Sequence, residues 1–140
     1  MKEELLFCGK CIDGGRWVIG FHVAITKGAW LSPAQNAHNI TEFKELENGE
    51  IILTDMHEVH AESVGRCTGL HDKNGTLIFE GHILSDMVGD IAKVFYKPSQ
   101  CAFMAEYVKC AYPEKMQGAF RIGKHCAGIE VIGHAYDETT

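Results

Sequence analysis

Glycine recurs along this sequence too often for long helices to form between its turns. The chain of 140 residues contains 15 Gly but only 3 Pro, and glycine accommodates tight turns while it weakens helix interiors. Short segments between such turns favour β-strands. Hydrophobic residues make up 46% of the chain and charged residues 23%, which is enough apolar material for a real core. The length fits one compact unit or two small coupled subdomains.

Two of the glycine-containing turns have the sequence of β-hairpins. Asp13-Gly14-Gly15 separates residues 5–12 from residues 16–23, and its flanks hold β-branched and aromatic residues. Asn74-Gly75 lies between residues 64–70 and 76–79, and Asn-Gly is favoured where a turn needs left-handed backbone. Further segments fit short strands: residues 51–53, 91–96, 101–107 and 129–133.

Helix is predicted to be minor. Residues 33–46 and 109–117 could each hold a turn or two of helix, and Ser32-Pro33 resembles an N-cap followed by a first-turn proline. Neither segment has a clean apolar stripe at the helical period, so helix and irregular structure both remain open there. The tail at residues 136–140 is short and polar, and we expect it to fray.

The charge of the chain and its first residues limit the partners and the compartment that we expect for it. A formal net charge of -6 would repel a phosphate backbone, and the Lys and Arg residues are scattered. Protonation of all 8 His would move the formal charge to +2, so we expect solubility and association to depend on pH. The first residues lack the pattern of a signal peptide, and no apolar run approaches the ~18 residues of a membrane span. We therefore expect a cytoplasmic protein without membrane contact, whose 6 Cys are mostly reduced.

Three blocks of the sequence resemble the YopX family, which occurs in phages and prophages of bacteria. The first runs from Phe7-Cys8-Gly9-Lys10 to Trp17-Val18-Ile19-Gly20-Phe21. The middle block is Thr68-Gly69-Leu70 with Asp72-Lys73-Asn74-Gly75 and Glu80-Gly81-His82-Ile83, and the last is Val131-Ile132-Gly133-His134-Ala135-Tyr136. His82 stands where the family usually has Asp, and His134 where it usually has Asn.

The resemblance implies a fold and a host, and it brings no known activity. It implies a mainly β fold with minor helix, in which an N-terminal β-hairpin subdomain (residues 1–70) is tightly coupled to a C-terminal SH3-type barrel (residues 71–140). It also implies a bacterial host. The shared residues are interpreted as scaffold, because glycines permit sharp turns or close backbone approach and a large aromatic anchors a small core. These signature residues are Trp17, Gly69, Asp72, Asn74, Gly75, Glu80, Gly81 and Gly133.

Cysteine and histidine supply weak candidates for a metal site. Cys8 and Cys11 form a Cys-x-x-Cys pair, and a zinc site of four ligands could be completed by His57 and His60. However, residues three apart on a predicted strand face opposite sides. Incidental cysteines are therefore the preferred interpretation, and no cofactor is predicted. The neighbours His125 and Cys126 would also point apart, so the sequence offers no verifiable catalytic arrangement and disfavours an enzyme.

Two hypotheses for function follow. The preferred one is a non-catalytic phage or prophage accessory protein that binds an unknown protein partner and forms homo-oligomers, since small sheets leave edge strands open for pairing. The alternative is a metal-dependent or nucleic-acid-binding protein. Its nucleic-acid version would use basic residues interleaved with aromatics such as Trp17, Phe95 and Tyr96, and the net charge disfavours it.

Overall fold

The computed structural model describes residues 3–27, 35–110, 119–123 and 128–138. The chain divides into two compact units, Met1–Arg66 and Cys67–Thr140, and strand β5 (Gly65–His71) crosses that boundary. Strands dominate the described residues, and α1 (Ala135–Glu138) is their one α-helix, so the predicted mainly β fold with minor helix is confirmed. No helix in this part of the chain has the length and apolar character to cross a membrane.

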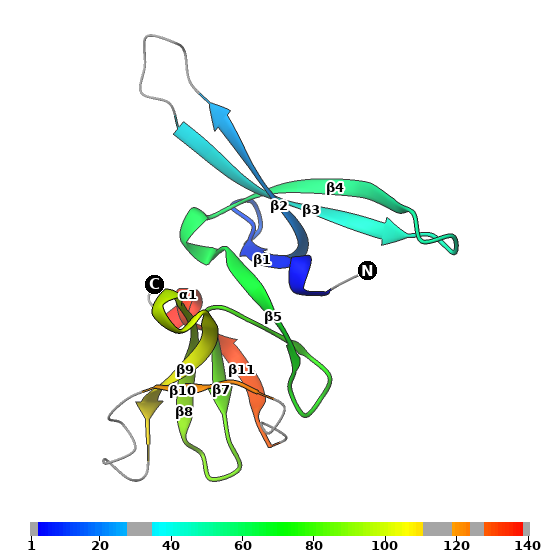
Figure 1. Cartoon of the computed structure of the whole chain (residues 1–140). Coiled ribbons are helices and arrows are strands. Elements are labelled where there is room, and N and C mark those ends of the chain that lie inside the picture. The colour runs from blue at the N-terminus through cyan, green and yellow to red at the C-terminus, as the bar shows by residue number, and fades with distance from the viewer. Residues whose placement is uncertain (1–2, 28–34, 111–118, 124–127, 139–140) are drawn as a thin grey trace. The chain divides into compact units, whose positions relative to one another are not determined.

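The first unit is built on an antiparallel sheet (Figure 1). Its strands are β1 (Phe7–Lys10), β2 (Trp17–Lys27), β3 (Gln35–Glu45) and β4 (Ile51–Val59), in the order β4-β3-β2-β1. The first residues of β5 pair with β1 on the far side, and the 3-10 turns η1 (Glu3–Leu5) and η2 (Ala61–Ser63) complete the unit. The predicted hairpin at Asp13-Gly14-Gly15 is confirmed as β1–β2.

One face of this sheet holds the core of the first unit. Val18, Ile40 and Val59, from β2, β3 and β4, are at most 3% exposed and pack with Cys11. Directly opposite residues of paired strands share a face, and neighbours along a strand alternate. The register Phe21↔Thr41 and Thr41↔Met56 therefore places the odd-numbered residues of β2 and β3 on the face that points away from this core.

The second unit contains a hairpin and a larger antiparallel sheet. The hairpin pairs β5 with β6 (Leu77–Phe79), which confirms the turn predicted at Asn74-Gly75. The sheet has the order β10-β9-β8-β7-β11. Its strands are β7 (His82–Ser85), β8 (Ile91–Lys97), β9 (Ala102–Lys109), β10 (Ala119–Arg121) and β11 (Glu130–His134), and the 3-10 turn η3 (Pro98–Gln100) lies between β8 and β9.

The main core cluster of the second unit consists of aliphatic residues, and the sheet of this unit is open. Ile78, Leu84, Ala92, Val94 and Ala105 are at most 5% exposed and form one cluster. Within the described residues no pairing joins β10 to β11, so the sheet is not closed there. The SH3-type barrel stays a prediction.

The prediction of helix within residues 33–46 is wrong for its described part, because residues 35–45 form strand β3. The segment has no apolar stripe at the helical period, and β2 and β4 pair with it on its two sides. Pairing on both edges outweighs a weak local preference. The other helix candidate begins in β9 at Lys109, and residues 111–117 lie outside the described part, as do Ser32 and Pro33.

Three hairpin turns have the same pattern of backbone hydrogen bonds. In each, the first residue accepts a hydrogen bond from a glycine three residues later, and its own N–H donates to the residue after that glycine. These first residues are Leu46, Asp72 and Asp86, and the glycines have φ of 86°, 85° and 88° in the same order. Left-handed backbone at that position suits a type I turn followed by a glycine bulge, and it costs glycine little.

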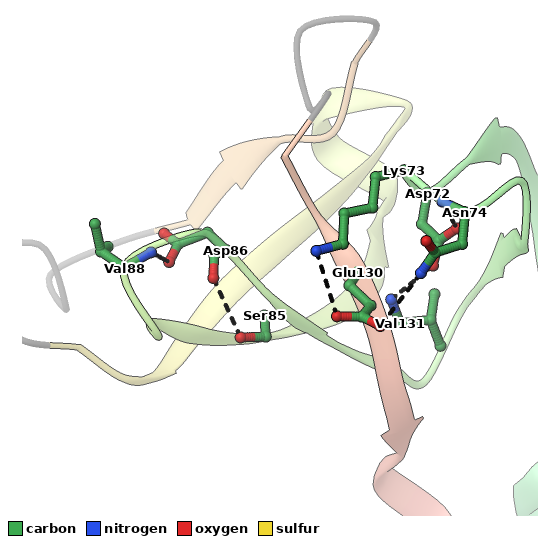
Figure 2. A network of polar contacts seen from close by, with 8 residues as sticks. All are labelled: Asp72, Lys73, Asn74, Ser85, Asp86, Val88, Glu130 and Val131. Carbon is green, nitrogen blue, oxygen red and sulfur yellow. Dashed lines mark hydrogen bonds and ion pairs between the residues drawn. The ribbon is translucent and has the colours of Figure 1, made fainter.

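Asp72 holds its turn and also ties that turn to β11 (Figure 2). Its Oδ1 accepts the N–H groups of Asn74 (2.8 Å) and Thr76 (2.9 Å), and its Oδ2 accepts the N–H of Val131 (2.9 Å). Burial would raise the pKa of Asp72, but these three N–H donors outweigh burial and lower it. Next to this carboxylate, Glu130 accepts from the Asn74 amide and pairs with Lys73.

Asp86 is a natural control for Asp72. Its Oδ1 accepts the N–H groups of Val88 and Asp90, both at 3.0 Å, so it makes the same two bonds within its own turn. The two aspartates therefore share their local role, and the bond to Val131 distinguishes Asp72. A carboxylate that joins a turn to a distant strand is expected to stabilise the unit more than one that holds only its turn.

Replacing Asp72 by Asn tests this tie. Asn keeps the oxygen for the turn, but it turns an NH2 group toward the Val131 N–H, so a buried donor loses its acceptor. We expect Asp72→Asn to lower the free energy of unfolding by about 2 kcal/mol, and Asp86→Asn by less than about 0.5 kcal/mol. Urea denaturation followed by circular dichroism measures both. Equal losses in the two variants would contradict the assigned role of the Val131 bond.

Candidate interaction surface

The four candidate metal ligands lie around the end of β1 and the end of β4. Cys11 follows β1 and is paired with Val59, while the His60 N–H donates to the Lys10 carbonyl. Cys8 and Cys11 are both buried, but Cys8 lies opposite Ile19 whereas Cys11 packs in the core on the other face. The pair therefore points to different sides of the sheet, as the strand alternation predicts.

His57 has a carboxylate partner close to the same place. Its Nε2 lies 2.8 Å from Oε1 of Glu42, and the Arg16 guanidinium approaches both side chains at 3.5 Å. His57 and Cys11 also line one cavity of about 350 Å³ with Met56 and Glu58. Among the described residues, however, no three His, Cys, Asp or Glu side chains are grouped closely enough to hold a metal ion. The metal candidates stay a prediction without a described ligand set.

The signature residues occupy turns, bulges and strand ends. Trp17 begins β2 opposite Lys10, and Glu80 lies in the turn between β6 and β7. Gly69 has φ of 80° within the irregular part of β5, and Gly133 adjoins the register shift of β11. With the turn formed by Asp72, Asn74 and Gly75, these positions shape the backbone of the chain.

Gly81, His82 and His134 pack closely together in the second unit, and we call this contact the Gly81 junction. Gly81 has φ of 89°, and a Cβ there would lie 2.6 Å from the ring of His134. The rings of His82 and His134 meet edge to face with their centroids 5.7 Å apart. The His82 Nδ1 accepts the Phe79 N–H, and the His134 Nδ1 accepts the Tyr136 N–H. The two positions that depart from the family pattern are therefore in contact.

One histidine in each of two close histidine pairs, His82 and His22, has a lowered pKa. Burial lowers the pKa of His82 to about 4, with a further decrease from His134 that Asp72 partly offsets. In the first unit, burial and then His38 lower the pKa of His22, whose Nε2 lies 2.9 Å from Nδ1 of His38. Since the pKa values of His82 and His22 are lowered, these two side chains stay neutral over a wider range of pH, and not all of the charge change predicted from 8 His occurs near neutral pH.

The most conspicuous surface of the first unit is the sheet face opposite its core. The register places Phe21, Phe43 and six aliphatic side chains on this face, together with the buried Asn39 and Thr41 of β3. The Phe21 and Phe43 rings are in contact, with their centroids 5.0 Å apart. The six are 39–58% exposed: Ile19, Val23, Ile25, Ile51, Leu53 and Met56. We call these eight residues the apolar face. Monomeric proteins rarely expose a contiguous apolar patch of more than a few hundred Å², so the face is a candidate interaction surface.

Sequence reasoning did not find the apolar face. The alternation of β2, from Ile19 through Phe21, Val23 and Ile25, was the available signal. That pattern is also typical of residues that point into a core. The register with β3 and β4 is what places these residues on the face opposite to Val18 and Ile40, where Ile19, Val23 and Ile25 stay exposed.

The effect of His82 on stability has a definite direction with pH. Its pKa is about 4 in the folded chain and 6.5 ordinarily, so between these values the unfolded chain binds more protons. We expect the His82 contribution to be complete above pH 6.5 and to fall by at most about 2–3 kcal/mol as the pH drops to about 4. Urea denaturation across this pH range measures it. His82→Gln should flatten the slope of stability against pH, and an unchanged slope in this variant would contradict the assignment.

Comparison with known proteins shows which family the chain resembles. Residues 24–140 match the family model described as YopX protein, a span that includes the Asp72 turn, the Gly81 junction and most of the apolar face. The block at Phe7–Phe21 lies before the matched span. A comparison with curated proteins found no match. Because the match covers well over half of its length, the chain belongs to the YopX family.

Proposed function

We propose that this chain is a non-catalytic accessory protein of a phage or prophage, which acts in the cytoplasm of a bacterial host by binding proteins. The apolar face is the observation that carries the proposal. Its six aliphatic side chains are well exposed on one sheet face, whereas the two metal candidates that line one cavity, Cys11 and His57, belong to no described ligand set.

The chemistry of the apolar face favours a protein as its partner. Contacts of aliphatic and aromatic side chains dominate the centres of protein interfaces, and nucleic acid requires a basic surface. The register places Lys10, Glu45 and Glu58 on the same side of the sheet, at its margins, so acidic groups outnumber basic ones there. Association with other copies of the chain is part of the proposal.

Binding through the apolar face is tested by capture on the immobilised full chain. Met56 is 56% exposed on the apolar face. A charged side chain in its place would have to lose its hydration in any contact made there, which would weaken binding. We expect Met56→Glu to reduce the proteins retained from a bacterial lysate, further copies of the chain included, by at least about tenfold. Ile132→Glu is the matched control, because Ile132 is 51% exposed on β11 of the second unit. Equal retention by wild type and Met56→Glu would refute the proposed role.

A further inference from the structure

We infer that the apolar face is covered by the apolar face of a second copy of this chain, packed sheet against sheet, and that the outer edge of β4 does not form the contact. This inference rests on the proposed function and names its partner. It departs from the expectation that an open edge strand forms the contact with another chain, because the structure shows that the outer edge of β4 is obstructed.

The outer edge of β4 is obstructed in two places. At its end, Ile12 donates to the Glu58 carbonyl and His60 donates to the Lys10 carbonyl, so the chain itself covers residues 58–60. Between the rungs Thr41↔Met56 and Phe43↔Leu53, β4 has one residue more than β3. That bulge contains Asp55, which is exposed. Bulges and charges are the devices by which edge strands avoid pairing with other chains, and only a short stretch near Ile51 is left.

The apolar face, by contrast, is compatible with a copy of itself. The charged residues on this side of the sheet, Lys10, Glu45 and Glu58, lie at its margins. Two copies can therefore meet through the eight apolar residues without placing a charge at the centre of the contact, although each copy carries a formal charge of -6. In a two-fold contact the same patch serves both partners. The rings of Phe21 on β2 and Phe43 on β3 are in contact, and Phe43 lies opposite Leu53 of β4. Aromatic side chains of two packed sheets can interdigitate at such a place.

The exposed area is sufficient for a symmetric pair. Six aliphatic side chains at 39–58% exposure, each somewhat smaller than an aromatic side chain of ~150–250 Å², present on the order of 500 Å². One copy therefore shows a patch at the upper end of what monomers expose. Two copies together would bury on the order of 1,000 Å², which reaches the size of a specific interface.

Adjacent residues of β4 provide the test. Leu53 (58% exposed) belongs to the apolar face, and Ile52 (49% exposed) points to the opposite side of the same strand. Light scattering and sedimentation of the full chain over a range of concentrations would measure the dimer dissociation constant. We expect Leu53→Asp to raise it at least ~100-fold and Ile52→Asp to change it less than ~3-fold. Met56→Asp is a second face variant, and circular dichroism checks the folding of all three.

Two results would overturn the inference. If Ile52→Asp and Leu53→Asp weaken the dimer equally, the edge of β4 makes the contact, since an added strand has both residues at its border. If the wild-type chain is monomeric at every concentration, the second copy is the wrong occupant. In that case the proposed function still stands if Met56→Glu abolishes capture of another protein, and it fails if that capture is unchanged.

Discussion

Burial on one side of the β2–β3–β4 sheet is the constraint on which the first unit depends. An antiparallel sheet with one solvated face normally alternates apolar residues toward the core with polar residues toward water. Here Val18, Ile40 and Val59 satisfy one face, while the other carries Phe21, Phe43 and six exposed aliphatic side chains. Because the hydrophobic effect scales with the apolar area kept from water, association through this face is the direct way to remove that cost.

The second unit meets a different constraint, the joining of segments far apart in the sequence. The Asp72 carboxylate holds its own turn and reaches Val131, 59 residues later. Gly81 leaves space for the ring of His134 and accepts the Ala135 N–H at its carbonyl. Most of the signature residues of this unit thus stabilise the backbone at its turns and bulges. In this chain the signature residues of the second unit therefore lie where they shape the backbone, and the proposed interaction surface lies chiefly on other residues.

The parts of the fold that could be predicted are those with a local cause. Asn74-Gly75 and Asp13-Gly14-Gly15 specify hairpins because glycine suits the backbone of their turns. Strand β3 could not be predicted, because its pairing with β2 and β4 overrides weak preferences in residues 35–45. The bond from Asp72 to Val131 and the contact between His82 and His134 join distant segments, and no local pattern encodes them. The apolar face could not be found for the same reason, since strand register decides which side is left uncovered.

We infer that copies of the chain meet through the apolar face, and not through the neighbouring edge or the opposite side of β4. Methyl NMR spectra of the full chain, recorded at increasing concentration, test it most directly. We expect the methyl signals of Ile19, Leu53 and Met56 to shift together as copies associate, and those of Ile52 on the other side of β4 to stay in place. Signals that do not change with concentration, or an Ile52 shift as large as that of Leu53, would contradict it.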